Sequence, residues 1–291
     1  MPAEFDRLVN LAFYVPIVIV MVLETLAPRR KPSRPTGQRW LHIAVLWIID
    51  TYVARAALAA SALVAAIEAG QIEWGLLHAV PLPGPVNFVL GFLLIDLTGY
   101  LKHRAYHALP ILWQLHVVHH SDVDMDVATG LRHHPGDYVI DGFIAIGVVF
   151  LLGISVESVL AFQFFTLIHN ALRHGNLDLP RWLDAALRTV IVTPDVHRIH
   201  HSADEHETNS NFGVILTCWD RWFGTYRAQP EKGHGAMDLG LEYFRDPSEN
   251  RLPSMLTQPL RQRRARAAVL GARPGDIAVP DLTPSAAGLD R

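Results

Sequence analysis

The sequence lacks several features that define common protein classes. Its 291 residues include one cysteine, Cys218, so the chain cannot form an internal disulfide. Only 18% of the residues are charged, and a net charge of −3 neither favours nor excludes a nucleic-acid partner; we expect none. A phosphate-binding glycine loop and a G-x-S-x-G nucleophile motif are also missing. These absences leave nucleotide-dependent and serine-hydrolase chemistry without support.

Long apolar runs are what the sequence has instead. Half of the residues are hydrophobic, and about 20 such residues in a row are enough to span a bilayer. We predict membrane spans at 8–27, 41–67 and 86–101. The shorter runs 138–152 and 156–172 predict a hairpin, either re-entrant or fully spanning. The expected fold class is an all-α integral membrane protein with about four transmembrane or re-entrant segments.

The charges between these runs predict an orientation. Residues 28–40 contain five Lys or Arg residues and no acid, whereas residues 68–85 contain two glutamates and no Lys or Arg. The positive-inside rule therefore places 28–40 in the cytoplasm and 68–85 outside. A multi-pass protein of a bacterial inner membrane, with a cytoplasmic histidine-rich helical cap, is the expected arrangement.

Histidines gather in one part of the chain. Thirteen of the sixteen fall between residues 103 and 206. They form three boxes, HRAYH at 103–107, HVVHH at 116–120 and HRIHH at 197–201, and the last two share one spacing. Spacings of three and four place side chains on one face of an α-helix, so each box is predicted to present its imidazoles to one point.

The number of histidines indicates metal. Neutral imidazole binds iron, zinc, copper and nickel, and a single zinc takes only three or four protein ligands. Eight imidazoles in three boxes exceed that number, which favours a dinuclear site. The predicted ligands from the boxes are His103, His107, His116, His119, His120, His197, His200 and His201.

The words around the boxes resemble the fatty acid hydroxylase and sterol desaturase superfamily of integral-membrane, non-haem di-iron oxygenases. The resemblance covers residues 86–226. It is carried by DLTGYLKHRAYH (96–107), LWQLHVVHHS (112–121), LRHHP (131–135), TPDVHRIHHS (193–202) and NFGVILTCWDRWFGTY (211–226). His134 and His174 occupy positions that the family often fills with histidine, which brings the predicted ligands to ten.

The resemblance implies an activity and its requirements. The expected reaction is O2-dependent hydroxylation or desaturation of a C–H bond in a sterol, fatty acyl chain or related lipid. Two iron ions, O2 and a separate electron-transfer protein would be needed, and the apolar helices would select the lipid. The oligomeric state is left open.

The remaining polar residues near the boxes are ranked below these ligands. Metal-bound imidazoles need an acceptor for their second nitrogen, and Asp96, Asp195, Asn176 and Asn211 are the candidates. His133, His169 and His206 are expected to be supporting or surface residues, with His169 an alternative to His174. His42, His78 and His234 are expected to be structural.

Two other classes of function stay open at this stage. A zinc-dependent membrane hydrolase would usually carry a carboxylate base, as in H-E-x-x-H, which this sequence lacks. A metal-binding or transport protein would place histidines along the spans. For the domains, we predict N-terminal membrane helices at 1–85, a catalytic domain at 86–226 and a polar, partly disordered tail at 227–291.

Overall fold

Helices make up the regular structure of the protein. The computed structural model describes residues 3–58, 61–271 and 273, and this part contains no strand beyond three isolated bridges. The longer helices are α1 (Ala3–Leu26), α2 (Thr36–Ala57), α3 (Ala62–Gln71), α5 (Gly84–Ala108), α6 (Pro110–His120), α7 (Pro135–Leu152), α8 (Val156–His174) and α14 (Leu252–Leu270). The shorter ones are α4 (Leu76–Ala79), η1 (Val127–Leu131), α9 (Arg181–Leu187), α10 (Pro194–His200), α11 (Glu205–Thr208), α12 (Cys218–Trp222), α13 (Gly233–Ala236) and η2 (Pro247–Asn250). The predicted all-α class is confirmed.

The outer surface of the long helices is apolar. Three stretches are long and apolar enough to cross a membrane: Thr36–Ala79, Gly84–Ala108 and Pro135–Leu152. Large hydrophobic side chains project outward from the long helices, including Leu41 at 62% exposed and Leu151 at 64%. Water penalises such a surface, whereas lipid tails accommodate it. The chain is an integral membrane protein.

The second predicted span, 41–67, is not one described helix. α2 ends at Ala57, and α3 starts after Ser61, whose hydroxyl accepts a hydrogen bond from the backbone N–H of Val64. The sequence between the two helices contains no glycine or proline, and the Ser61 N-cap is the one local signal of the break. Residues 59 and 60 lie outside the described part of the chain. The predicted runs 138–152 and 156–172 coincide with α7 and α8.

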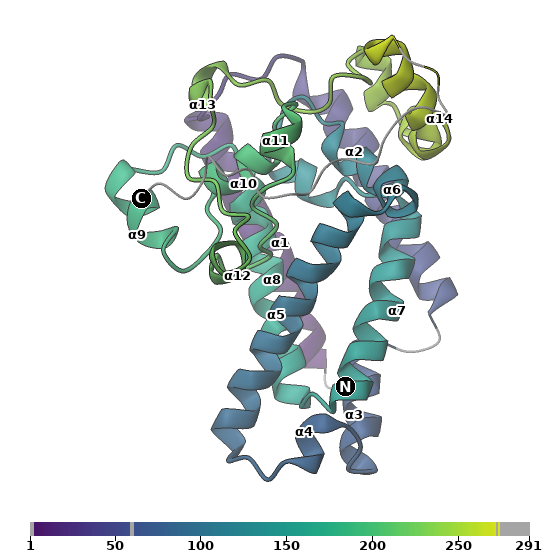
Figure 1. Cartoon of the computed structure of the whole chain (residues 1–291), viewed down its shortest axis with the longest axis vertical. Helices are drawn as coiled ribbons and strands as arrows, with labels where there is room; N and C mark the ends of the chain where they lie inside the picture. The colour runs from purple at the N-terminus through teal and green to yellow at the C-terminus, as the bar shows by residue number, and fades with distance from the viewer. Residues whose placement is uncertain (1–2, 59–60, 272, 274–291) are drawn as a thin grey trace.

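Helices α6 and α10, which carry the second and third histidine boxes, lie toward one end of the molecule (Figure 1). Figure 1 shows α3 and α4 at the opposite end from α10, α11 and α13, with α1, α5, α7 and α8 running between the two ends. We define the cap as residues 109–134 and 175–271. At the corner between α5 and α6, Leu109 has an extended backbone and Pro110 begins the next helix. Because proline disfavours a helical residue before it, the chain turns here and α6 packs back on α5.

Residues 227–271, which belong to the predicted polar, partly disordered tail at 227–291, pack against the rest of the protein. α14 packs on α6, where Met255 is fully buried in a cluster with Trp113, Val117 and Tyr243. The sequence of this helix looks polar because it contains several arginines, and the apolar face that packs on α6 is narrow. Residues 274–291 lie outside the described residues.

Candidate metal centre

Nine of the ten predicted ligands meet in two buried clusters. The five-histidine cluster contains His103, His107, His116, His120 and His200; the four-histidine cluster contains His119, His174, His197 and His201. Within each cluster one nitrogen from every ring lies within 4.8 Å of those of the others. The nine histidines come from α5, α6, α8 and α10, with His201 directly after α10, so four helices converge on the site.

The second and third boxes each divide between the two clusters, which corrects the expectation that a box serves one point. His116 and His120 share one face of α6, and His119 points to the other cluster. In the third box His197 and His201 stay together, and His200 joins the five-histidine cluster. Residues four apart are about 40° apart around a helix, but neighbours are about 100° apart, so H-x-x-H-H serves two centres. The second and third boxes are therefore shared between the clusters.

A short loop orients the five-histidine cluster from outside. Residues 208–212, which we call the acceptor loop, face the Nδ1 atoms of four of its rings. His103 Nδ1 donates to the Phe212 carbonyl (2.9 Å), His107 to Asn209 Oδ1 (3.2 Å), His120 to Thr208 Oγ1 (3.4 Å) and His200 to the Ser210 carbonyl (2.7 Å). A carbonyl or amide oxygen only accepts, and the Thr208 hydroxyl already donates to the His200 carbonyl, so each of these Nδ1 atoms carries the proton and each Nε2 presents a lone pair. The Nε2 atoms of all five rings are buried, with no hydrogen-bond partner in the described chain.

The fifth ring, His116, faces a carboxylate instead. Its Nδ1 lies 3.8 Å from Asp137 Oδ2, and neither oxygen of this buried carboxylate has a hydrogen-bond partner among the described residues. Among the described residues, Asp137 of α7 is the acidic side chain that groups with these histidines. Sequence reasoning missed it because it stands far from His116 along the chain.

In the four-histidine cluster the lone pairs face one another. His119 and His174 donate Nδ1–H to the carbonyls of Arg132 and Asn170, so their Nε2 atoms are unprotonated. These two Nε2 atoms are 3.3 Å apart, and His197 Nε2 is 3.0 Å from that of His174. Two facing lone pairs repel each other, and a cation between them removes the repulsion. The donor set therefore fits a metal ion.

Burial keeps these imidazoles neutral. Loss of solvation lowers the pKa values of His120, His197 and His201 well below the ordinary value, and the neighbouring histidines lower them further. For His200 the same burial lowers the pKa to about 3. Metals bind the neutral ring, so both clusters are ready to bind metal at neutral pH.

The tenth predicted ligand, His134, lies in neither cluster. Its Nδ1 accepts a hydrogen bond from the backbone N–H of Gly136 and caps α7. The adjacent His133, which the sequence ranked low, is nearer the site. Its ring stacks on His119 with centroids 4.3 Å apart, and its Nδ1 lies 3.7 Å from Asp137. Of these two neighbours, His133 and not the predicted His134 lies beside the clusters.

The four predicted supporting residues have other roles. In the described structure none of them makes a hydrogen bond to a clustered histidine. Asp96 accepts from three N–H groups of residues 215–219, Asp195 pairs with Arg29 and Arg198, and Asn176 binds Arg30. Asn211 lies in the acceptor loop with a left-handed φ of 54°. Its side chain forms hydrogen bonds with the backbone of Val196 and Arg227. It shapes the loop whose neighbours face the imidazoles.

The other histidines lie apart from the two clusters. His169 is buried, and its Nε2 donates to the Val192 carbonyl at 2.8 Å, so the alternative to His174 is not supported. His234 lies 3.5 Å from Asp195, and His206 precedes the acceptor loop. His42 and His78 belong to α2 and α4, away from the site.

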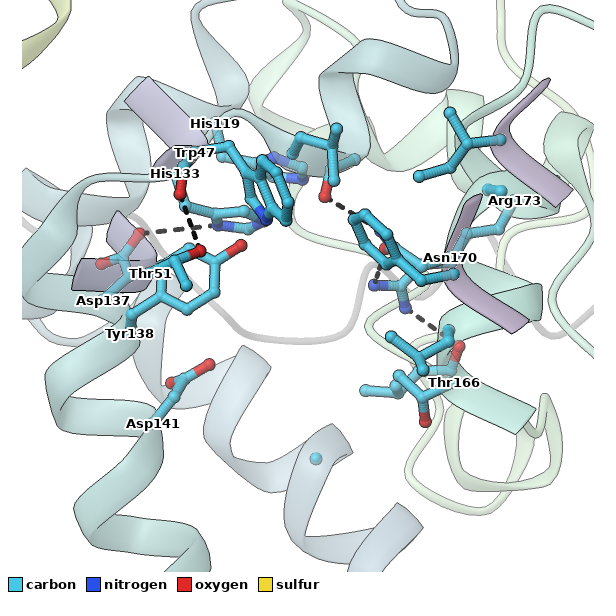
Figure 2. A pocket seen from close by; sticks show the side chains of 18 of the residues that line it. Trp47, Thr51, His119, His133, Asp137, Tyr138, Asp141, Thr166, Asn170 and Arg173 are labelled. Carbon is cyan, nitrogen blue, oxygen red and sulfur yellow. Dashed lines mark hydrogen bonds and ion pairs between the residues drawn. The ribbon is translucent and has the colours of Figure 1, made fainter. Parts of the chain in front are cut away.

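A cavity of about 590 Å³ adjoins both clusters. His103, His116, His119 and His197 contribute to its lining. Figure 2 shows His119, His133 and Asp137 on one side of the cavity, and Asn170 and Arg173 on the other. Apolar side chains from α1, α2 and α8, such as Phe13, Trp47 and Phe162, complete the walls. The space lies between helices whose outer surfaces face lipid.

Fold and site together define an integral membrane protein with a poly-histidine centre suited to two metal ions. Residues 88–225 match the fatty acid hydroxylase family. The chain is 27% identical to the ornithine lipid hydroxylase OlsE of Rhizobium tropici, over 92% of this chain and 80% of that protein. It is also 31% identical to the alkylglycerol monooxygenase of Xenopus tropicalis over 55% of this chain, and 29% identical to that of Homo sapiens over 54%.

Residues 88–225 belong to the fatty acid hydroxylase family, and the chain is a membrane oxidoreductase of that type. It spans 35% of the length of the Xenopus tropicalis monooxygenase and 34% of the human one. No solved structure gives a significant match. The predicted family is confirmed.

Proposed function

We propose that the protein hydroxylates a lipid C–H bond with O2 at a di-iron centre held by the two histidine clusters. The observation that carries this proposal is the division of nine neutral imidazoles into two adjacent groups beside an apolar cavity. Iron accepts imidazole ligands, and two iron ions would supply O2 reduction and C–H oxidation. Hydroxylation is preferred over desaturation because the relatives are named hydroxylases and monooxygenases.

The chain's own residues would bind and orient the substrate. The lipid would enter the cavity between α1, α2, α5, α7 and α8, with the target carbon beside His116 and His119. Phe13, Trp47 and Phe162 would exclude water from the reacting carbon. The acceptor loop would hold the rings of His103, His107, His120 and His200 in one tautomer while substrate binds and product leaves.

The catalytic domain, the electron donor and the membrane location are part of the same proposal. Residues 86–226 would form the catalytic domain, and a separate electron-transfer protein would deliver electrons to the cap. The basic stretch 28–40 favours a cytoplasmic cap, and the bacterial relative favours a bacterial inner membrane. Neither zinc hydrolysis nor metal transport is favoured, since the relatives are lipid oxygenases and the cluster histidines face one another rather than forming a path.

The test begins with the metal. Elemental analysis and Mössbauer spectra of protein purified from iron-enriched cells are expected to give about two irons per chain as a coupled pair, in line with the two clusters. O2 uptake with a chemical reductant should then rise when total lipid extract is added, and mass spectrometry should find a product heavier by one oxygen. Zinc alone after iron-replete anaerobic preparation, or product formation without O2, would contradict the proposal.

A further inference from the structure

Large apolar side chains lie exposed on one side of the cap. Trp222 and Phe223, at the end of α12, are 73% and 42% exposed, and nearby Val190 is 59% exposed. The two segments are joined, because the Thr217 N–H donates to the Val190 carbonyl at 3.0 Å. The neighbouring helix α9 carries another tryptophan, Trp182, that is 73% exposed. Rings of this size are rarely left in water without a binding partner.

The hydrogen bonds of Asp96 fix the level of this surface along α5. Its carboxylate accepts from Ile215 N (3.1 Å), Leu216 N (3.2 Å) and Trp219 Nε1 (2.8 Å). Asp96 is buried six residues before Lys102, the first cation of α5, and six residues of helix rise about 9 Å. Residues 215–219 therefore lie beside the apolar part of α5, on the N-terminal side of Lys102, its first cation.

The exposed rings continue the lipid-facing surface of α5. Phe223 stacks on Tyr100 of that helix with centroids 5.3 Å apart, and Trp222 packs edge-on against Trp219 at 5.2 Å. Leu101, next to Tyr100, is 47% exposed. Figure 1 shows α12 next to the upper parts of α5 and α8, with α9 further out on the same side of the molecule. The exposed Arg221 and Arg181 flank the rings, where lipid phosphates would meet them.

We propose that residues 215–223, with Val190, form a membrane-inserted rim of the cap. Trp222 and Phe223 would lie at the boundary between lipid headgroups and acyl chains, a zone that tryptophan prefers because its ring is apolar and its N–H is polar. The backbone N–H groups that enter this zone are not left unpaired, since Asp96 accepts from Ile215 and Leu216. The rim sets the depth of the cap in the bilayer and does not depend on the metal or the reaction.

Spin labels test the depth of this rim in the full-length protein. In a Cys218→Ser background, Trp222→Cys and Val190→Cys would each be labelled with a nitroxide in nanodiscs of phosphatidylglycerol and phosphatidylcholine. Val89→Cys, on the 51% exposed outer face of α5, is the lipid control, and Lys232→Cys, whose side chain is 68% exposed, is the water control. Retention of the parent's metal content would verify that each labelled protein is folded.

Oxygen dissolves in lipid and a nickel chelate in water, so the ratio of their effects on the spectrum measures depth. For labels at 222 and 190 we expect ratios well above that at 232 and up to that at 89. A ratio equal to that at 232 would overturn the proposal by placing the rim in water. Protection from both reagents would also overturn it, because protein, such as a second copy of the chain, would then cover the rim.

Discussion

At the scale of single residues, the tautomer of each clustered histidine depends on the group that its Nδ1 atom faces. Four of the five rings in the larger cluster are oriented by residues 208–212, and three of these acceptors are a carbonyl or an amide oxygen with no proton to give. The tautomer is thus fixed before any metal arrives. A ring free to choose its tautomer would present a lone pair to the centre only part of the time.

The first prediction concerns Asn209, the one side-chain amide in this set. Asn209→Leu keeps the size of the residue and removes the acceptor of His107 Nδ1, so metal affinity should fall by about 10–100-fold. Competition with a chelator measures the change. Ser210→Ala is the matched control, because His200 binds the carbonyl of residue 210 and not its hydroxyl. Equal affinities in the two variants would contradict a role for the Asn209 side chain.

A second prediction concerns pH in the metal-free protein. Burial lowers the pKa of His200 to about 3 in the folded state, against about 6.5 in an unfolded chain. Between these values the unfolded chain binds more protons, so the free energy of unfolding should decrease as pH falls from about 6.5 toward 3. The slope approaches about 1.4 kcal/mol per pH unit for each such histidine. Denaturation at several pH values measures it; a flat profile would show that the rings are solvated.

Nine of the ten histidines that the sequence predicts as ligands come together in the fold, whereas His134 does not. Local spacing was enough to bring His103 and His107 together, and His116 and His120. The roles of Asp137 and Asn209 depend on contacts between segments far apart in the chain, which no local pattern carries. His134 illustrates the reverse problem: a helix cap and a metal ligand look alike in a sequence, and only the fold separates them.

At the scale of elements, η1 packs against α8 with almost no free space. A Cβ added to Gly130 would lie 2.8 Å from Asn170 Nδ2 and 2.9 Å from His174 Nδ1. Gly130 thus allows η1 to approach a predicted ligand closely. The sequence predicted neither η1 nor this contact, because a short 3-10 turn has no periodic apolar face.

The third prediction follows from this contact. Gly130→Ala should displace His174 and lower metal binding at the four-histidine cluster, so about one metal ion per chain should be lost or weakly held, measured by elemental analysis after gel filtration. Gly147→Ala is the control, since its added Cβ meets nothing within 4 Å. Full occupancy in Gly130→Ala would show that the cluster tolerates a shift of α8.

Helix α2 is joined to the cap by one buried cation. Arg39, 3% exposed, pairs with Asp122 at 2.6 Å and with Asp126. As a fourth prediction, Arg39→Leu should leave two buried carboxylates without their partner and destabilise the protein by about 3–5 kcal/mol. Thermal unfolding in detergent measures this, with Arg29→Leu, whose ion pairs are partly exposed, as the milder comparison. Equal effects of the two changes would argue against a special role for Arg39.

At the scale of the whole molecule, the cavity connects the lipid-facing helices to the clusters. Thr51 lines it from α2 (Figure 2) and is no part of either cluster. As a fifth prediction, Thr51→Trp should fill part of the cavity and lower kcat/KM for the lipid substrate by at least about tenfold while metal content stays unchanged. Val53→Trp is the control, because Val53 lies on α2 but does not line the cavity. Unchanged kinetics in Thr51→Trp would place the substrate elsewhere.

The overall architecture could be predicted because membrane spans and histidine boxes are both strong local signals. The break between α2 and α3 and the packing of α14 could not. The first depends on one serine cap, and the second on a helix whose apolar residues are interrupted by four arginines. Both features depend on packing between segments that are far apart in the sequence.

The origin of the ligands in four helices has a consequence for assembly. The five-histidine cluster joins His103 to His200, and the four-histidine cluster joins His119 to His201. A bound ion at each would act as a reversible cross-link that closes a loop of more than eighty residues, and the long loops make such closure costly in the unfolded chain. The supply of metal during synthesis should therefore decide how much of the chain reaches a tightly assembled state, independently of how much activity each finished molecule has.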